Sequence, residues 1–143
     1  MKKAERAEQV RDRMSRSPVT ISSEESLQSA MELLHKHNIR ELPVVEHGDL
    51  IGIVTDRDLR EIAPSYPVFR DQAEIRYYLQ NLKVAKAMTV DPLKISPESP
   101  LLEAAKVLHT YRIGALPVVE NGRLVGIISV TDLLKAFIEQ NQD

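Results

Sequence analysis

The pattern of hydrophobic and polar positions in this chain occurs twice, at a fixed offset of 74 residues and without a gap. Residues 10–60 align with residues 84–134, and 22 of the 51 aligned pairs are identical. Internal repetition on this scale indicates two copies of one folding unit. Such copies tend to pack about a pseudo-two-fold axis, and the groove between them can hold up to two equivalent ligand sites. We therefore expect the function to follow from this symmetry.

Each copy begins with a short extended segment, at residues 18–21 and 92–95, followed by a helix-start signal. Ser22 and Glu25 have the spacing of a capping box, and Ser96 precedes a proline suited to the first helical position. These signals predict helices that begin at Ser22 and Ser96. Apolar residues then recur at helical spacing and predict a buried face, formed by Leu27, Ala30, Met31 and Leu34 in the first copy and by Leu101, Ala104, Ala105 and Leu108 in the second.

Two β-prone runs separated by a tight turn follow in each copy. His47-Gly48 and Asn121-Gly122 fit hairpin turns, and Asn-Gly is the stronger signal. The returning strands are almost continuously apolar, which indicates burial on both faces. A second helix is expected to begin at Thr55 and at Ser129. The fold class is therefore predicted to be α/β (α+β), with two β-α-β-β-α repeats, residues 8–63 and 84–140, packed with pseudo-two-fold symmetry.

The repeats are joined by a segment at residues 64–83. Pro64 and Pro67 are expected to end the preceding helix. Residues 73–82 place apolar side chains on one side of a further short helix. A flexible linker would be more polar and richer in glycine. The segment is thus expected to bridge the copies and to cover part of their surface.

Composition narrows the class of protein. The chain has 43% apolar and 28% charged residues and a formal net charge of −2, which is typical of a globular domain and gives no general electrostatic case for nucleic acid or an anionic membrane. Residues 1–16 carry six basic and three acidic side chains; a solvated helical arm is favoured there over a docking tail. The absence of cysteine excludes disulfides, thiolate catalysis and cysteine-ligated metal. No signal peptide or membrane-spanning run is evident, so the default location is the cytoplasm.

The order of these motifs resembles that of the cystathionine-β-synthase (CBS) domain. The resemblance rests on Leu-Pro-Val-Val-Glu, the x-Gly hairpin, Gly-Ile-Val/Ile and Thr/Ser-x-x-Asp, each present twice, and covers roughly residues 8–140. The chain is similar to a tandem CBS pair, or Bateman module, of the stand-alone bacterial acetoin-utilisation type. This resemblance implies a regulator that binds AMP, ADP, ATP or S-adenosylmethionine in the cleft between repeats. It also implies a homodimer and an unidentified regulated protein.

Each repeat carries a hydroxyl-x-x-aspartate motif where its second helix begins, Thr55 to Asp58 and Ser129 to Asp132. One carboxylate can accept hydrogen bonds from both hydroxyls of a ribose, and each such bond contributes about 1.5–3 kcal/mol. The same spacing is that of a capping box, in which the acid satisfies backbone donors. Spacing alone favours capping, whereas the resemblance implies that Asp58 and Asp132 bind ribose. The two roles can coexist.

The resemblance also implies an apolar slot for the purine and cations for phosphate. Core packing is the alternative for each apolar candidate, and simple solvation is the alternative for each arginine. Lys94 stands where the first repeat has Thr20, so the two sites are expected to differ and one of them could be empty. The candidate nucleotide-binding residues are Thr20, Ile39, Arg40, Pro43, Ile53, Thr55, Arg57 and Asp58 in the first repeat, and Arg112, Ile113, Pro117, Ile127, Ser129 and Asp132 in the second.

Other chemistry finds little support in the residues. His35 and His37 project about 200° apart on a helix, so they cannot share one metal ion. The chain contains none of the phosphate-loop, zinc-protease or nucleophile-elbow motifs. We expect no enzymatic activity, no catalytic cofactor and no metal site.

The main alternative function is a ligand-free module that dimerises and binds a partner protein, using Leu133, Leu134, Phe137 and Ile138. A DNA-binding regulator is a further alternative, but no recognition helix is evident.

Overall fold

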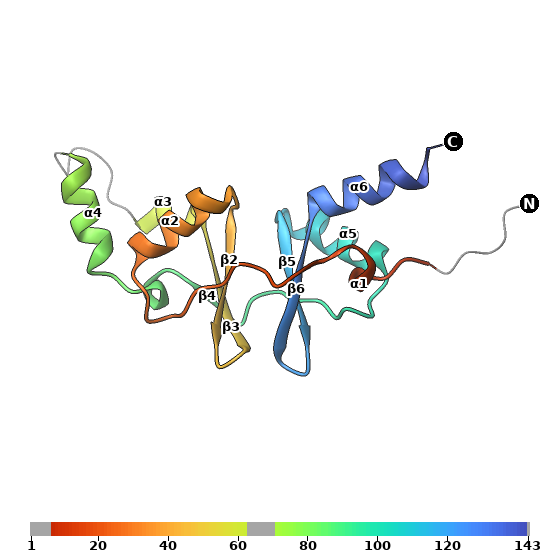
Figure 1. Cartoon of the computed structure of the whole chain (residues 1–143), viewed down its shortest axis with the longest axis horizontal. Coiled ribbons are helices and arrows are strands. Elements are labelled where there is room, and N and C mark those ends of the chain that lie inside the picture. The colour runs from red at the N-terminus through yellow and green to blue at the C-terminus, as the bar shows by residue number, and fades with distance from the viewer. Residues whose placement is uncertain (1–6, 63–70, 143) are drawn as a thin grey trace, which may run out of the picture. The chain divides into compact units, whose positions relative to one another are not determined.

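The structure is a computed structural model that describes residues 7–62 and 71–142 (Figure 1). The chain divides into two compact units, each built around one of the sequence repeats. The first-repeat unit comprises Val19–Pro92, and the second-repeat unit comprises Met1–Pro18 together with Leu93–Asp143. Both units mix helices and strands, which confirms the predicted fold class. The expected helix break at Pro64 and Pro67 and the first basic residues, up to Arg6, lie outside the described residues.

The first-repeat unit contains an antiparallel three-stranded arrangement in which β3 lies between β2 and β4. Two helices of the repeat, α2 and α3, accompany the β2–β3 hairpin, and the insert between the repeats forms α4 and a short 3-10 turn, η1. In chain order the elements are α2 Leu27–His37, β2 Glu41–Glu46, β3 Asp49–Thr55, α3 Asp56–Ile62, α4 Gln72–Gln80, η1 Val84–Lys86 and β4 Thr89–Val90.

The second-repeat unit has the same arrangement, with β6 between β5 and β1. Its two repeat helices are α5 and α6, and a single helical turn, α1, precedes β1. The elements are α1 Val10–Arg13, β1 Ser15–Arg16, α5 Leu101–Tyr111, β5 Ala115–Glu120, β6 Arg123–Ser129 and α6 Val130–Gln140. No counterpart of α4 occurs in the part of this unit that the structure describes.

The hairpin turns are as expected. His47 and Gly48 have φ values of 52° and 87°, and Asn121 and Gly122 have φ values of 54° and 80°. Positive φ at both central residues matches the right-handed twist of the flanking strands. Because both turns connect strands in the same register, Pro43 pairs with Ile53 and Pro117 with Ile127.

The predicted helix starts were wrong by about one turn. The first helix begins at Leu27, with Ser26 as its N-cap, and the equivalent helix begins at Leu101 after Pro100. Ser22 instead holds a separate turn, because its hydroxyl accepts a hydrogen bond from the Glu24 N–H at 3.2 Å. The chain after this turn is tied to distant segments: Leu27 N donates to Leu82 O at 2.8 Å and Leu101 N to Glu8 O at 2.9 Å.

The extended segments that open the repeats pair at only one residue. Ile21 forms a parallel bridge with Val44, and Ile95 forms one with Val118. The short strands that complete each unit lie earlier in the chain than these segments, in β1 and β4. The first residues of each sequence repeat therefore belong to the compact unit of the other repeat.

Two glycines allow these short strands to approach closely. A Cβ atom on Gly52 would lie 2.9 Å from the Met88 sulfur and 2.9 Å from the Thr89 carbonyl oxygen. A Cβ atom on Gly126 would lie 2.7 Å from the Met14 sulfur and 2.8 Å from the Ser15 carbonyl oxygen. No side chain fits at these distances. Glycine is therefore required where β4 pairs with β3 and where β1 pairs with β6.

Each unit has its own hydrophobic core. Leu27, Ala30 and Leu34 are buried on α2, and Ala104 and Leu108 are buried on α5, as the helical spacing predicts. The insert contributes the fully buried Leu79 and the partly buried Ile75 and Tyr78 from α4, and the partly buried Leu82 after it, to the core of the first-repeat unit. This confirms the predicted apolar side of α4, and it explains why the insert forms a helix rather than a flexible linker.

Candidate nucleotide-binding sites

The open end of each hairpin lies beside the start of the second helix of the repeat. In the first-repeat unit, Glu41 at the start of β2 pairs with Thr55 at the end of β3. Arg40 O accepts a hydrogen bond from Asp56 N at 3.0 Å. In the second-repeat unit, Ala115 pairs with Ser129 in the same register.

The aspartates of both motifs cap their helices. Asp58 Oδ2 accepts a hydrogen bond from Thr55 N at 2.9 Å, and Asp58 N donates to Thr55 Oγ1 at 3.0 Å. Asp132 Oδ2 accepts from Ser129 N at 2.8 Å and from Ser129 Oγ at 2.9 Å, and Asp132 N donates to Ser129 Oγ at 3.1 Å. The capping interpretation left open by the sequence is therefore realised in both repeats.

Capping uses only one oxygen of each carboxylate. Within residues 7–62 and 71–142, the Oδ1 atoms of Asp58 and Asp132 accept no hydrogen bond. Both side chains are part-buried, so these oxygens are held in one orientation by the bonds to Oδ2. An oriented anionic acceptor with unused capacity is what a pair of neighbouring hydroxyl donors requires.

The extended segment of the first repeat lies beside the same hairpin. Ile21 N donates to Pro43 O at 3.1 Å, which places the neighbouring Thr20 next to the strand that carries Pro43. Pro43 in turn pairs with Ile53. Pro43 and Ile53 thus lie opposite each other on β2 and β3, and Thr20 precedes the residue that bridges to β2. Thr55 ends β3, and Asp58 follows in the first turn of α3.

The second-repeat unit reproduces this layout. Ile95 N donates to Pro117 O at 3.0 Å, and Pro117 pairs with Ile127. Arg112 ends α5 in the left-handed conformation, with φ 55°, and Ile113 N then donates back to Leu108 O at 3.1 Å. Arg112 therefore lies at a sharp turn directly before Ile113 and β5. Asn38 has the same left-handed conformation, with φ 51°, before Ile39.

The arginine within the first motif is engaged elsewhere. Arg57 Nε lies 3.4 Å from Glu61 Oε1, one helical turn away, and both side chains are exposed. An exposed i,i+4 pair of this kind is weak and is screened by salt. Arg57 can therefore leave Glu61 at little cost, although no contact among the described residues of the first-repeat unit directs its side chain toward Asp58.

Sequence reasoning overlooked one charged residue at this end of the hairpin. Glu41 lies opposite Thr55, and burial, together with the charge of Asp56, raises the pKa of its carboxyl group, while Arg40 acts in the opposite direction. The second repeat has Ala115 at the aligned position. The difference between Glu41 and Ala115 at this aligned position is the sequence signal that could have revealed it.

No group of three or more potential metal-ligating side chains occurs among the residues that the structure describes. In the same residues, no helix combines the length and the apolar character needed to cross a bilayer.

Comparison with known proteins identifies the repeats. The CBS domain family matches residues 8–65 and 84–139. A CBS domain-containing protein of Dictyostelium discoideum is 39% identical over 133 residues, which cover 91% of each chain. The crystal structure of a putative acetoin utilization protein, AcuB, from Vibrio cholerae is 30% identical, with a TM-score of 0.78, and the match covers 94% of this chain and 93% of that one.

Two further similar structures contain adenosine ligands. The CBS domain pair of protein MJ0100, in complex with 5′-methylthioadenosine and S-adenosyl-L-methionine, is 28% identical, with a TM-score of 0.76 and coverage of 95% and 100%. CBSX2 in complex with AMP is 25% identical, with a TM-score of 0.78 and coverage of 94% and 99%. Because the family matches both repeats and the similar structures are CBS pairs over nearly their whole length, this chain belongs to the CBS domain family and carries a tandem CBS pair.

Proposed function

We propose that this protein is a regulatory module that binds an adenosine-containing small molecule, with Asp58 and Asp132 as the ribose-binding residues of two sites. The ligands of the similar structures support the adenosine class, since one holds AMP and another holds S-adenosylmethionine and methylthioadenosine. The proposal includes no catalytic role for the module.

The observation that carries this proposal is that each aspartate uses only one of its two carboxylate oxygens in capping its helix. Oδ2 of Asp58 and of Asp132 caps a helix, and the part-buried side chain leaves Oδ1 unused among the described residues. Capping fixes the carboxylate before a ligand arrives, so little conformational entropy is lost on binding. The capping role therefore supports ribose binding and does not compete with it.

The two sites are proposed to prefer different ligands. Near Asp58 the first repeat adds Glu41 and Asp56, whereas the second repeat has Ala115 and Val130 at the aligned positions. Negative charge near a phosphate is unfavourable. We infer that the Asp132 site accepts AMP, ADP or ATP, because Arg112 lies two residues before Gly114, whose carbonyl oxygen accepts a hydrogen bond from Val130 N at 3.0 Å. In the first repeat Glu41 and Asp56 offset the cations Arg40 and Arg57, so the Asp58 site suits a ligand with less negative charge, such as S-adenosylmethionine.

A regulatory module must transmit its ligand state. Ligand binding changes the arrangement of the repeats only to the extent that the ligand binds one arrangement more tightly than another. The proposed reader of that change is a regulated partner protein, and the proposed assembly is a homodimer. An apolar surface on α6, at Leu134, Phe137 and Ile138, is the observation that favours dimerisation.

Titration calorimetry with AMP, ADP, ATP and S-adenosylmethionine tests the proposal, with GMP as a control for the base. We expect saturable binding of at least one adenosine compound, with no more than two molecules per chain. Asp58→Asn and Asp132→Asn each retain an oxygen for capping but lose the anionic acceptor, so each is expected to weaken one site. No heat with any of the four compounds at millimolar concentration would contradict the proposal and favour a ligand-free dimerisation module.

A further inference from the structure

A recess with a mainly apolar surface lies among α2, α3 and α4 of the first-repeat unit. It consists of two adjoining pockets, of about 410 Å³ and 190 Å³, whose shared lining includes Met31 and Ile75. Leu34, Leu59 and Leu79 line the larger pocket and are buried. We call the two pockets together the α2–α4 groove. A recess of this size and character is typical of sites that hold a small organic molecule.

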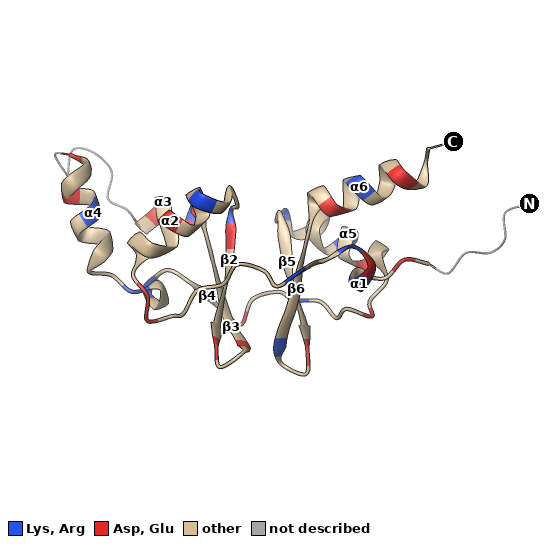
Figure 2. Ribbon diagram, in the orientation of Figure 1, with Lys and Arg blue, Asp and Glu red and all other residues tan. Residues whose placement is uncertain are grey.

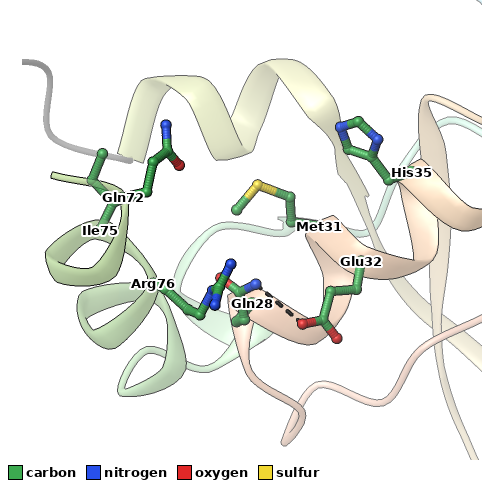
Figure 3. Close-up of a pocket in the computed structure, with 7 residues that line it drawn as sticks. All are labelled: Gln28, Met31, Glu32, His35, Gln72, Ile75 and Arg76. Carbon is green, nitrogen blue, oxygen red and sulfur yellow. Dashed lines mark hydrogen bonds between the residues drawn. The ribbon is translucent and has the colours of Figure 1, made fainter.

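Side chains from two helices face each other across the smaller pocket (Figure 3). Met31 projects from α2 into the space in front of α4, and Arg76 reaches from α4 toward Gln28 and Glu32 of α2. Ile75, one residue before Arg76, lines both pockets. The groove thus combines apolar contact area with a guanidinium group at its edge.

The acids of the groove lining already have partners. Glu32 Oε1 accepts a hydrogen bond from Gln28 Nε2 at 3.1 Å. Asp56 Oδ2 lies 3.5 Å from Arg60 Nη1, one helical turn away on α3. A pair of this kind at the surface is weak and is screened by salt, so Arg60 can turn toward another anion at little cost.

Two arginines of the lining have no such partner. Both signs of charge occur along α2 and α4 (Figure 2), so the charge of the groove depends on which residues line it. Within residues 7–62 and 71–142, the guanidinium groups of Arg40 and Arg76 take part in no hydrogen bond or salt bridge. Guanidinium groups without partners, beside apolar walls, are complementary to an anion that also has an apolar part.

The groove is a feature of the first repeat. The insert helix α4 forms one wall, and the described part of the second-repeat unit has no such helix. At the offset of 74 residues, Arg40 aligns with Gly114, and the Asp56–Arg60 pair aligns with Val130 and Leu134. The hydroxyl-x-x-aspartate motifs occur in both repeats, whereas the charged groups of the groove do not. The groove therefore points to a ligand other than the one that the duplicated motifs would bind.

The groove and the proposed ribose position also involve different residues of the same helix. Asp56 and Leu59 of α3 line the groove, whereas Asp58 caps the start of α3 and is absent from the lining of both pockets. Ile39 and Arg40 are the candidate nucleotide-binding residues that do line it. Substitutions on α3 and α4 can therefore alter the groove and leave Asp58 in place.

We propose that the α2–α4 groove binds a small organic anion made of a single carboxylate on a short apolar chain. The chain contacts Met31, Ile75 and Leu79, and the carboxylate lies among the arginines of the lining. A carboxylate matches the planar guanidinium group in paired hydrogen bonds. Its single negative charge suits a lining that keeps Glu32 and Asp56, because these would repel a more highly charged phosphate more strongly. This site goes beyond the proposed function and does not rest on it.

Octanoate is the probe, and the backbone amide resonances of the isotopically labelled chain report where it binds. We expect saturable shifts that concentrate on α2, α3 and α4. Affinity should rise from butanoate through hexanoate to octanoate, by up to about fourfold for each buried methylene group. Octylamine has the same chain length and the opposite charge, so it should bind at least about tenfold more weakly than octanoate. Equal affinity for the two compounds, shifts confined to other elements, or no saturable shift at millimolar octanoate would overturn the proposal.

Substitutions then separate the groove from the net charge of the chain. Arg60→Gln and Arg76→Gln, both at exposed positions, should each weaken octanoate binding, and the double variant should weaken it about tenfold. Lys36→Gln removes an exposed cation of α2 that lies outside the lining, and it should leave the affinity unchanged. A loss in Lys36→Gln as large as in the double variant would show attraction by net charge alone and would contradict the site. Octanoate binding by a chain that binds no adenosine compound would support this site and contradict the proposed function.

Discussion

Asp132 accepts two hydrogen bonds from Ser129, one from its backbone N–H and one from its hydroxyl, and both end on the same carboxylate oxygen, Oδ2. Thr55 and Asp58 repeat the backbone part of this arrangement in the first-repeat unit. A residue with a structural role is thereby left with one unused oxygen in a fixed orientation. Helix capping and ligand binding can therefore be separated by substitution.

The hydroxyl of Ser129 should matter for stability more than for ligand binding. Ser129→Ala removes the acceptor of the Asp132 N–H and the donor to Oδ2, so we expect a loss of about 0.5–2 kcal/mol in the free energy of unfolding. Urea denaturation followed by circular dichroism measures this loss. Thr55→Ala is the matched change in the first repeat. An unchanged midpoint in both variants would show that the capping boxes do not stabilise the helices.

Gly52→Ala should destabilise the first-repeat unit. The added Cβ would meet the Thr89 carbonyl oxygen at 2.9 Å, and a backbone atom cannot move aside without displacing β4. We expect a cost of about 1–3 kcal/mol, measured by thermal or chemical denaturation. The double variant Gly52→Ala/Met88→Ala relieves the contact with sulfur but not the contact with the backbone. Full recovery of stability in that double variant would contradict this explanation.

Glu41→Gln should stabilise the protein at neutral pH. Burial and the charge of Asp56 raise the pKa of Glu41 above its ordinary value of 4.5, so the ionised form is disfavoured in the folded state. The folded chain holds this proton more tightly than the unfolded chain, and stability is lost as the pH rises through the folded pKa. The variant should thus melt at a higher temperature than the wild type at pH 7, and the difference should shrink below about pH 4.5. A difference independent of pH would be inconsistent with the raised pKa.

Glu46→Gln should make the protein less stable, while Glu120→Gln should have a much smaller effect. Glu46 Oε1 accepts hydrogen bonds from Ser23 Oγ, Ser22 Oγ and Ser23 N, at 2.8, 2.9 and 3.0 Å, which lower its pKa. The second repeat has Pro97 in place of Ser23, and proline has neither of these donors.

The pH dependence of Glu46 has the opposite sign to that of Glu41. Its contribution is present above the ordinary carboxyl value of 4.5 and is lost as the pH falls through the lower folded pKa. Thermal melts of Glu46→Gln and Glu120→Gln at about pH 3 and about pH 7, on either side of the usual carboxyl pKa, compare the two positions. Equal effects of the two substitutions would mean that the serine contacts contribute nothing.

Much of the fold could be predicted because its local signals agree. The two hairpin turns require positive φ at both central residues, and asparagine, histidine and glycine adopt it at Asn121-Gly122 and His47-Gly48. The apolar residues of α2 and α5 recur at the helical period, so they lie on one face, and this is the face that the core buries. The helix starts were misplaced because Ser22 and Ser96 cap separate turns, an alternative use of the same side chains.

Other features had no local signal. β1 and β4 contain two residues each, and their partners lie far away in the chain, so no period could reveal them. The hydroxyl-x-x-aspartate motifs were found, but spacing could not decide between capping and ribose binding, since both use the same residues. Glu41 was overlooked because its role depends on burial and on Asp56, which follow from the strand register.

The central claim is that one aspartate oxygen binds the neighbouring hydroxyls of a ribose, and comparison of AMP with 2′-deoxy-AMP tests it most directly. Calorimetry of the wild type should show 2′-deoxy-AMP binding at least about tenfold more weakly, because each hydrogen bond to a charged group contributes about 1.5–3 kcal/mol. In the double variant Asp58→Asn/Asp132→Asn, the two ligands should bind with equal, weakened affinity. If the wild type bound both ligands equally well, or the double variant still preferred AMP, the claim would be contradicted.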